Sequence, residues 1–446
     1  MVDIKSSNSL KREENEMSKK KEITIETLAR VEGHGGIKVE IKDNKISNVE
    51  FRILEGPRLF EALIVGRTPQ EDLSIVPRIC AICNLSHKYA ALRGLEKALG
   101  VKVDSTTNLY RQLMHNGEII ESHSLHLYFL ALPDFLGYDN AFAMTDKYGD
   151  TVEGALQLKK FSNKVMRMMG GRMMHGENPI LGGFGKLPTK EKLIKIKEEA
   201  LRMLPFAIET INLLAGLEIP DHMERETQFL CCKPPHDDYG YYGDILMTSD
   251  GEEHPVESYL SVIKERVVSH SFAKRGQYKN KPFTVGALAR VLLLGKRLKG
   301  KAKEAYDKVF TERWHRNPLF NNHSQAIEQI HSLERIIEII NELLTSANSK
   351  IAKPTQDTGT GTGAIEAPRG TLIHHYEVQH GLISAVDIIT PTSMFLDDIE
   401  EFIRTSGNTL LAKNQLENIE LEFEMIARAY DPCISCSAHI VEVVYK

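Results

Sequence analysis

The segment RICAICNLSH, residues 78–87, brings two cysteines and one histidine close together in the chain. On a helix, Cys80, Cys83 and His87 stand at positions i, i+3 and i+7, which share one face. That spacing directs two thiolates and an imidazole to one point. Thiolates are soft donors that suit zinc, iron–sulfur clusters, or nickel and iron in low oxidation states. The plain alternative is a pair of buried helical cysteines with a histidine satisfied in the core.

A second segment of the same kind lies near the other end of the chain: DPCISCSAH, residues 431–439. Pro432 excludes Cys433 from a helix interior and predicts a turn or a helix start, where the helix dipole stabilises a thiolate. The two cysteine pairs begin 353 residues apart (433 − 80) and can supply four thiolates to one site. With both pairs present, a coincidence of buried cysteines explains the pattern poorly.

Two kinds of metal site fit four cysteines in two C-x-x-C pairs. Structural zinc commonly uses such pairs, but it usually pins small modules, whereas these pairs would join the two ends of a large chain. Each pair is also followed by a histidine, which exceeds what a tetrahedral site requires. From these residues alone, a structural zinc site and a catalytic soft-metal site both stay open.

The composition is typical of a soluble globular protein, since 42% of the 446 residues are hydrophobic and 26% are charged. It excludes a disordered chain, a collagen and a small disulfide scaffold. The net charge of −5, from 56 basic and 61 acidic residues, gives no reason to expect nucleic acid or an anionic membrane as a partner. The sequence has no apolar run of about 18 residues, so we expect no membrane span.

The N-terminal residues 1–22 are charged and polar, without the apolar segment of a secretory signal. We expect them to form a disordered tail, and Met17 offers a second possible start. Because the proposed metal ligands come from both ends of the chain, residues 23–439 are expected to form a single catalytic domain.

The fold class that the sequence predicts is α+β and predominantly helical. Residues 37–53 predict an antiparallel hairpin, because apolar and polar residues alternate on both sides of the turn Asp43-Asn44-Lys45. Residues 176–188 and 353–370 are rich in glycine and proline and are expected to be loops. The glycines of the second loop fit neither common nucleotide motif and follow no predicted strand. Helices are expected over residues 78–99, 107–131, 152–176, 190–217 and 324–347, with one or two more within 393–430.

Five motifs in order make the chain similar to the large subunits of nickel–iron hydrogenases. They are R-[IV]-E-G-H at 30–34, R-x-C-x-x-C-x-x-x-H at 78–87, G-R-x-x-H at 171–175, E-A-P-R-G at 366–370 and D-P-C-x-x-C-x-x-H at 431–439. The resemblance implies that family's fold, with a central bundle of long helices and N-terminal antiparallel strands. Within the family, the cysteine segments most resemble the cytosolic, bidirectional, NAD(P)-linked branch, close to the sulfhydrogenase alpha subunits of archaea. A cytoplasmic protein is therefore expected.

The resemblance implies a bimetallic centre. Nickel would be bound by all four cysteines, with Cys83 and Cys436 also bridging to an iron that carries carbonyl and cyanide ligands. The four implied nickel ligands are Cys80, Cys83, Cys433 and Cys436. Pro391-Thr392 matches the place where the family hydrogen-bonds a cyanide ligand. A terminal thiolate, or Cys436 as the bridging member, would accept a proton when dihydrogen is split.

The resemblance also implies roles for three charged residues. Glu32 would be the proton exit for Cys436, since a carboxylate suits a relay in a dry site; otherwise it is a helix-capping or ion-paired carboxylate. Arg369 would hold its guanidinium over the open coordination position, as a base or an electrostatic partner, and its alternative is a structural ion pair. Asp431 would hold Arg369 in place.

A hard-cation site is implied near the C-terminus. Glu61, the backbone carbonyl of Ile388 and His439 would surround magnesium or a similar ion, whose oxygen-rich coordination tolerates one imidazole. The alternative for Glu61 is a solvated helix carboxylate. In the family, a C-terminal extension is removed after this histidine by a dedicated endopeptidase once nickel is inserted. Residues 440–446 are therefore expected to be cleaved from a precursor.

Two other groups depart from the family pattern. Many relatives have an aspartate where Ser122 stands, which puts that acid in doubt. His123 and His126 are interpreted as core histidines. Cys231 and Cys232 match no family ligand and are interpreted as packing residues.

The expected activity is reversible, heterolytic cleavage of dihydrogen, with two electrons passed on. No further cysteine cluster is present for an electron relay, so an iron–sulfur small subunit is expected, with flavin and iron–sulfur diaphorase subunits carrying the site for NAD(P), sulfur or polysulfide. A nickel chaperone is expected for maturation. Two alternatives stay open: a non-catalytic, hydrogenase-like subunit of a respiratory complex, and a zinc-stapled scaffold.

Overall fold

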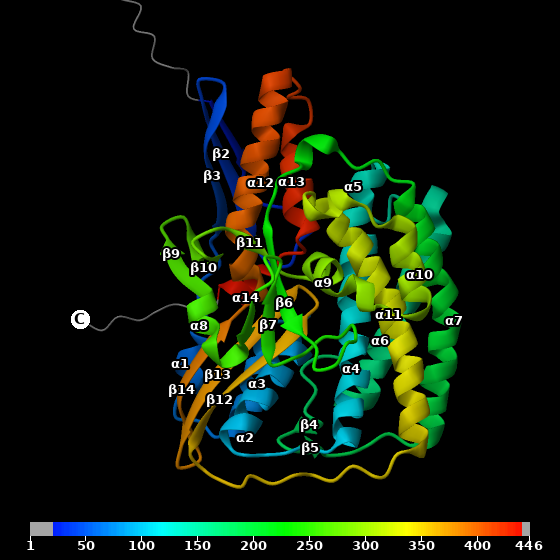
Figure 1. Ribbon diagram of the computed structural model, residues 1–446. Coiled ribbons are helices and arrows are strands. Elements are labelled where there is room, and N and C mark those ends of the chain that lie inside the picture. Colours follow the sequence, from blue (N-terminus) through cyan, green and yellow to red (C-terminus); the bar gives the residue numbers. More distant parts are fainter. Residues whose placement is uncertain (1–20, 439–446) are drawn as a thin grey trace, which may run out of the picture.

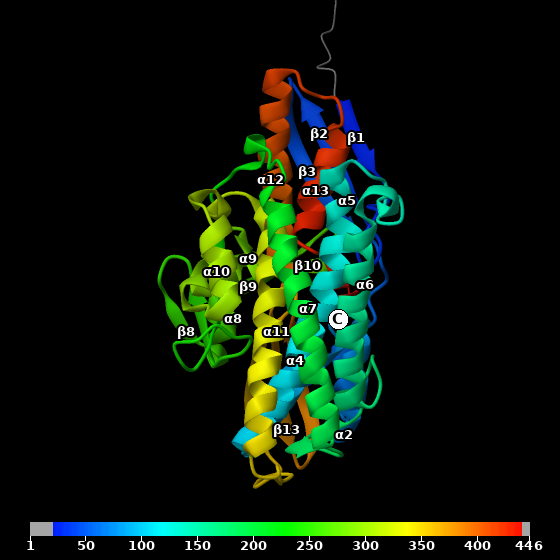
Figure 2. The ribbon, with the colours of Figure 1, turned by 90° about the vertical axis from the view of Figure 1, so that its right-hand side faces the viewer.

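The computed structural model describes residues 21–438, and its largest feature is a bundle of long helices (Figure 1). The bundle helices run side by side in both views, and α11 packs against α4 and α7 while α4 packs against α6 (Figure 2). The central long-helix bundle implied by the sequence is therefore confirmed. Its members are α4 (Ser105–Ser124), α6 (Thr145–Gly170), α7 (Lys190–Ala215) and α11 (Asn321–Thr345).

The long helices lie where the periodic spacing of apolar residues predicts them. Within α11, Ile327, Ile330 and Leu333 are fully buried at helical spacing. The stretch over 393–430 divides into α12 (Pro391–Lys413) and α13 (Ile419–Ala429). The α4 helix continues through a π-helical turn at Leu125–Ala131 into α5 (Leu132–Leu136).

One helix ends earlier than its sequence predicts. The α6 helix was expected to run to Gly176, but it ends at Gly170, where Gly171 takes the left-handed conformation with φ of 83°. Glycine reaches this conformation without a Cβ penalty, and it is therefore the usual residue just after a helix. The glycine that ends the helix thus lies five residues before Gly176 in the sequence.

The N-terminal hairpin is confirmed. Strands β2 (Gly35–Lys42) and β3 (Lys45–Ile53) pair antiparallel. Both turn residues, Asp43 and Asn44, have positive φ (52° and 57°), as the two-residue turn of a right-twisted hairpin requires. A third strand, β1 (Lys21–Ile25), pairs with β2 and includes the last two residues of the expected polar tail. Residues 1–20 and 439–446 lie outside the described residues.

The expected loop over 353–370 is wrong in its second half. Residues Gly359–Ala367 form strand β12, the first of three antiparallel strands with β13 (Gly370–Gln379) and β14 (Leu382–Ile389). The sheet is covered by α3 (Asn84–Ala98). A Cβ at Gly361 would lie 2.2 Å from the carbonyl oxygen of Gly94 on α3. The glycines therefore allow a strand and a helix to pack closely, which is an alternative to phosphate binding that local sequence does not reveal.

Smaller elements complete the described part of the chain. The strands and short helices not yet given are α1 (Phe60–Ile64), α2 (Pro69–Ile75), β4 (Pro179–Ile180), β5 (Gly183–Phe184), β6 (Gln228–Lys233), β7 (Ile245–Thr248), β8 (Glu253–Pro255), α8 (Tyr259–Val262), β9 (Ile263–Val268), β10 (Ser271–Tyr278), β11 (Phe283–Thr284), α9 (Ala287–Leu294), α10 (Gly300–Val309) and α14 (Ile434–Ser437). The sheet β11-β6-β7-β8 and the ribbon β9–β10 were not predicted.

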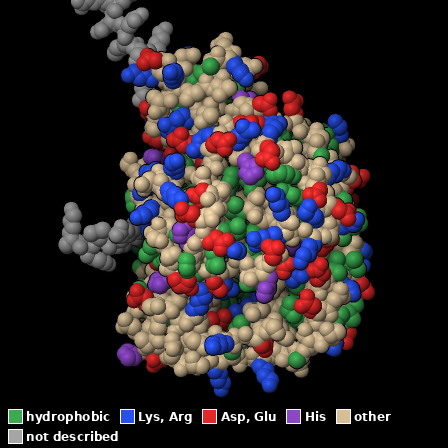
Figure 3. Space-filling model, viewed as in Figure 1, with side chains coloured by type: hydrophobic (Ala, Val, Ile, Leu, Met, Phe, Trp, Pro, Cys, Tyr) green, Lys and Arg blue, Asp and Glu red, His purple; other side chains and the backbone are tan. Residues whose placement is uncertain are grey.

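Charge is spread evenly over the face shown in Figure 3, where acidic and basic side chains are interspersed. Among the described residues, no helix is both long enough and apolar enough to cross a membrane.

Candidate metal centre

The first cysteine pair lies in a turn ahead of α3, so the continuous helix expected from residue 78 is wrong at its start. The helix begins only at Asn84, and Cys80 has an extended backbone with φ of −139° and ψ of 140°. The backbone N–H groups of Ile82 and Cys83 donate to the Cys80 sulfur, at 3.3 and 3.2 Å. The sulfur thus accepts bonds that a helix would give to a carbonyl. Of the three side chains expected on one helical face, only the histidine lies on the helix.

The second cysteine pair lies at a helix start, as Pro432 predicted. Cys433 is the residue before α14, and its backbone pairs with that of Glu32 in an isolated bridge. The N–H of Ile434 donates to the Glu32 carbonyl oxygen at 3.0 Å. The N-terminal motif that contains Glu32 therefore holds the C-terminal cysteine segment beside the β2–β3 hairpin.

The two pairs meet in one buried cluster. One sulfur from each of the four cysteines lies within 4.8 Å of the others. Cys80 and Cys433 sulfurs are 3.3 Å apart, those of Cys83 and Cys436 are 3.2 Å apart, and those of Cys433 and Cys436 are 2.6 Å apart. All four side chains are at most 3% exposed and none is in a disulfide. The sequence prediction that both ends of the chain converge here is confirmed.

The electrostatics of the cluster indicate what it can hold. Burial raises the pKa of Cys433 and of Cys436 well above the usual range, and Cys80 and Cys83 add to the effect on both. Four thiolates cannot share so small a dry volume unless a cation compensates them. A soft metal ion supplies that charge, and the sulfur donors suit nickel, iron or zinc. The residues present therefore fit a metal of this class.

Arg369 lies beside the sulfurs in the two-residue turn between β12 and β13. Its Nε donates to the backbone carbonyl oxygen of Asp431 at 2.8 Å, and its Nη2 lies 2.8 Å from the Asp431 Oδ1. Burial opposes the charge of the guanidinium, but Asp431 and the thiols raise the pKa of Arg369 well above its usual value. A permanent positive charge is thus held against the cluster. Nη1 donates to the Ser122 hydroxyl at 3.3 Å, so Ser122 contacts the arginine although it replaces an acid.

Thr392 and Glu32 contact the same cysteine segment from two sides. The Thr392 hydroxyl accepts the N–H of Cys433 at 3.0 Å, and Pro391 is the first residue of α12. The Glu32 carboxylate accepts the N–H of Ser435 at 3.1 Å and also the Ser435 hydroxyl. Glu32 is half-buried, so it lies between the cluster and the surface. It also caps the first turn of α14, as its structural alternative expected.

Glu61 and Ile388 lie together, as the resemblance implied, but the contact uses the backbone N–H of Ile388 instead of its carbonyl oxygen. The Glu61 carboxylate accepts the backbone N–H of Ile388 at 2.8 Å. Burial raises the pKa of Glu61 to about 7, and the bond from Ile388 lowers it only in part. The Glu61 carboxylate is therefore bonded to the backbone of β14, while its side chain stays partly exposed. His439, the third expected ligand, lies outside the described residues.

Comparison with known proteins identifies the family. The family model of nickel-dependent hydrogenases matches residues 58–152 and 237–439. The chain belongs to the nickel-dependent hydrogenase family. It is 43% identical over 422 residues to sulfhydrogenase 1 subunit alpha of Pyrococcus furiosus, which covers 94% of this chain and 98% of that protein. Sulfhydrogenase 2 subunit alpha of the same organism is 36% identical over 433 residues, covering 94% of this chain and all of the relative.

The hydrogenase fold is confirmed by solved structures as well. An NAD⁺-reducing [NiFe]-hydrogenase in the H₂-reduced state matches with a TM-score of 0.85 and 25% identity, covering 94% of this chain and 99% of that one. The predicted family, and the fold with a helix bundle and N-terminal strands, are therefore both right.

Several residues of this hydrogenase chain behave as core groups. His123 contacts Glu328 at 2.6 Å, and His126 contacts Gln325 at 2.6 Å, both fully buried. Cys231 and Cys232 lie on β6 and burial raises the pKa of each thiol. Neither belongs to the four-sulfur cluster, which agrees with their interpretation as packing residues.

Sequence reasoning missed two residues at the centre. Arg58 donates to the carbonyl oxygens of Ile79 and Ser435, at 2.7 and 2.6 Å, and so ties the two cysteine loops together. Glu118 accepts the N–H of Leu85 at 2.8 Å, and burial raises its pKa to about 8. Neither residue stands in a cysteine motif, and a single charged residue gives no local signal of a contact far along the chain.

Proposed function

We propose that this chain is the catalytic large subunit of a nickel–iron hydrogenase, which reversibly cleaves and forms dihydrogen at a centre held by the four clustered cysteines. The observation that carries the proposal is the meeting of four buried thiols beneath one buried, positively charged guanidinium. A nickel–iron pair with carbonyl and cyanide ligands on iron would supply the heterolytic splitting of dihydrogen. The chain itself supplies ligands, charge and a route for protons.

Glu32 is the proposed proton exit. Its carboxylate accepts bonds from Ser435, the residue directly before Cys436. A proton received by the Cys436 sulfur would therefore pass to the Glu32 carboxylate, which is bonded to the neighbouring residue and is partly exposed. General acid–base transfer of this kind requires a positioned acceptor within hydrogen-bond reach or one water away.

Arg369, Asp431 and Thr392 are proposed to serve the open side of the centre. Arg369 would stabilise charge that develops there, since a preorganised cation in a dry site acts strongly. Asp431 would fix the guanidinium through its carboxylate and its carbonyl oxygen. The Thr392 hydroxyl already accepts a bond from Cys433, so its own proton is directed elsewhere and suits a cyanide ligand. Pro391 would hold the start of α12 at this place.

A hard cation such as magnesium is proposed near Glu61, the Ile388 carbonyl and His439. The half-buried Glu61 carboxyl, whose pKa is raised to about 7, gains from a cation that compensates its charge. Such an ion would tie the C-terminal segment to the β12–β14 sheet. Removal of residues 440–446 by a maturation endopeptidase, after delivery of nickel by a chaperone, would complete that tie.

Electrons are proposed to leave through an iron–sulfur small subunit. Exposed apolar side chains lie beside the first cysteine loop: Met173 (38% exposed) and Met174 (45%) line a pocket together with Ala81 and Ile82. Exposed apolar groups gathered near a buried functional centre are typical of an interaction surface. Flavin-bearing partner subunits would then pass electrons to NAD(P) or to sulfur or polysulfide, as the names of the relatives suggest for those proteins.

Elemental analysis and infrared spectroscopy of the purified, mature complex test this function. We expect nickel and iron together, with infrared bands from metal-bound carbonyl and cyanide, and dihydrogen-dependent reduction of a redox dye. Zinc alone would support the stapled scaffold, and no metal would support a non-catalytic subunit. Absence of the carbonyl and cyanide bands from mature protein would overturn the proposal.

A further inference from the structure

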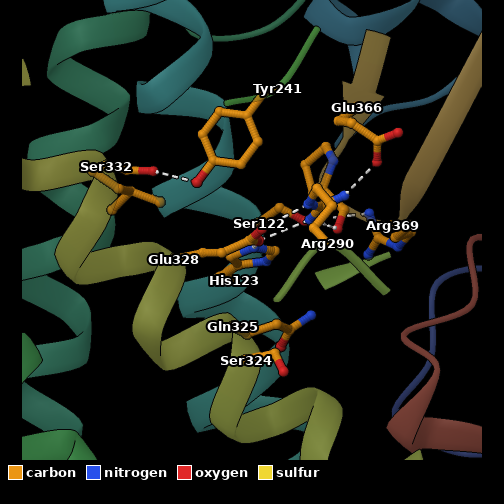
Figure 4. A network of polar contacts seen from close by, with 12 residues as sticks. Ser122, His123, Tyr241, Arg290, Ser324, Gln325, Glu328, Ser332, Glu366 and Arg369 are labelled. Carbon is orange, nitrogen blue, oxygen red and sulfur yellow. Dashed lines mark hydrogen bonds and ion pairs between the residues drawn. The ribbon is translucent and has the colours of Figure 1, made fainter. Parts of the chain in front are cut away.

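Arg290 is the centre of a buried charged network next to the metal site. It lies on α9, its side chain is fully buried, and Figure 4 shows it between Glu366 and Glu328 with Arg369 nearby. Arginine in such a place is costly, since buried ion pairs repay their desolvation poorly. Its contacts therefore indicate a purpose beyond stability.

Arg290 hydrogen-bonds to the backbone directly before Arg369. Its Nη1 donates to the carbonyl oxygen of Ala367 and its Nη2 to that of Pro368, both at 3.0 Å. Nη1 also contacts the Glu366 carboxylate at 3.0 Å. The three residues before Arg369 are thus held by one planar guanidinium, and the turn between β12 and β13 has little freedom to shift.

The same turn is packed tightly against the start of α9. A Cβ at Gly370 would lie 2.4 Å from Val285 Cγ2, and one at Gly286 would lie 3.0 Å from the Arg369 carbonyl oxygen. Both glycines have positive φ, 136° and 108°. The turn and the segment that leads into the helix of Arg290 are therefore closely packed against each other.

The long helix α11 provides the rigid support for this unit. Arg290 Nε and Nη2 donate to the two oxygens of Glu328 at 2.6 and 2.7 Å, a bidentate pair in a fully buried place. Three residues earlier on α11, Gln325 donates to the Asp431 carboxylate at 3.2 Å. One helix thus fixes Arg369 through Arg290, and fixes its partner Asp431 directly.

We propose that Arg290 is a positioning residue, which sets the placement of the Arg369 guanidinium over the metal centre by clamping the β12–β13 turn to α11. The inference rests on the proposed function of Arg369. Lysine keeps the charge of Arg290 but has no planar fork and cannot bond Glu328, Ala367 and Pro368 together. Misplacement of a reacting group by about 1 Å can cost about 100-fold in rate.

The test is a double-mutant cycle in the nickel-loaded complex. Arg290→Lys, Arg369→Lys and the double variant are compared for nickel content, kcat with a redox dye, and deuterium uptake of the peptide covering residues 366–371. The matched control is Arg275→Lys, because Arg275 is equally buried and pairs with Glu400 and the Phe51 carbonyl instead of the β12–β13 turn. If Arg290→Lys does not fold, Glu366→Gln is used instead, because it weakens the contact between Arg290 and the Glu366 carboxylate.

We expect Arg290→Lys to keep nickel, to lower kcat about 100-fold, and to add nothing further in the Arg369→Lys background. Deuterium uptake of the 366–371 peptide should rise in Arg290→Lys and stay at the wild-type level in Arg275→Lys. Additive losses of kcat, or unchanged uptake, would overturn the inference. A wild-type complex without nickel or dihydrogen activity would refute the proposed function instead, and the uptake measurement would still report whether Arg290 fixes the turn.

Discussion

Arg369 and Asp431 form a fully buried pair, with Nη2 and Oδ1 2.8 Å apart and Nε bonded to the Asp431 backbone at 2.8 Å. The two residues come from segments that also carry the E-A-P-R-G and D-P-C motifs. Two bonds from one guanidinium fix its plane as well as its position. The aspartate therefore directs the positive charge at the adjacent thiols.

Arg369→Lys should lower turnover by about 100-fold or more, because one preorganised donor is commonly worth that much. Lysine retains a positive charge, so the pair with Asp431 persists and nickel content should not change. Dye-linked dihydrogen oxidation and elemental analysis of the same sample check both statements. Normal turnover in a nickel-replete variant would contradict the role.

Glu32→Gln should keep both metals and lose hydrogen–deuterium exchange with solvent, by about 100-fold. The amide can accept the Ser435 N–H and donate to its hydroxyl, so the cap on α14 survives while proton transfer does not. Exchange followed by mass spectrometry of the headspace gas measures the effect. Glu26→Gln, an exposed neighbour in the same part of the chain, is the control. If Glu32→Gln exchanged at the wild-type rate, Glu32 would not be on the proton route.

Cys83→Ser should reduce nickel from stoichiometric to background, because a hydroxyl is a hard donor that stays protonated at neutral pH. Cys232→Ala should keep nickel, since Cys232 is a buried residue of β6 outside the cluster. Metal analysis of both variants after the same maturation decides the matter. Retention of nickel by Cys83→Ser would remove this residue from the ligand set.

The metal centre was predictable because its signals are local and chemical. Each C-x-x-C pair is visible in a few residues, and metal chemistry predicts that the two pairs meet, as their sulfurs do across 353 residues. The expectation that both cysteines of the first pair lie on a helical face was wrong. A turn can have the same i, i+3 spacing, and here the Cys80 sulfur accepts the backbone N–H groups of Ile82 and Cys83. Sequence spacing identified the donors but not the backbone that presents them.

The parts that sequence could not provide depend on contacts between distant segments. The glycines of strand β12 predict a loop because glycine is conformationally free, whereas in the fold they allow close packing on α3. Arg290 and Arg58 carry no motif, and each is defined only by the carbonyl oxygens it reaches across the fold. The β2–β3 hairpin was predictable for the opposite reason, since its turn residues and its alternation are all local.

Asp72 predicts a pH dependence of stability. Its side chain on α2 is fully buried, and burial raises its pKa from 3.8 to about 7, which the nearby Tyr376 lowers only in part. Because the folded chain holds this proton more tightly than the unfolded chain, the stabilisation is fully present below pH 3.8 and is lost as the pH rises through 7. Wild type should therefore lose stability over this range, at about 1.4 kcal/mol per pH unit from this group.

Asp72→Asn cannot ionise and should escape that loss. Relative to wild type, its melting temperature should improve steadily from pH 5 to pH 7 and then level off at higher pH, as Asp72 becomes ionised in both states of wild type. Thermal unfolding of both proteins across this range measures the difference. Asp139→Asn, at an exposed position, should follow the wild-type curve. A constant offset between Asp72→Asn and wild type at every pH would show that the buried carboxyl does not titrate with folding.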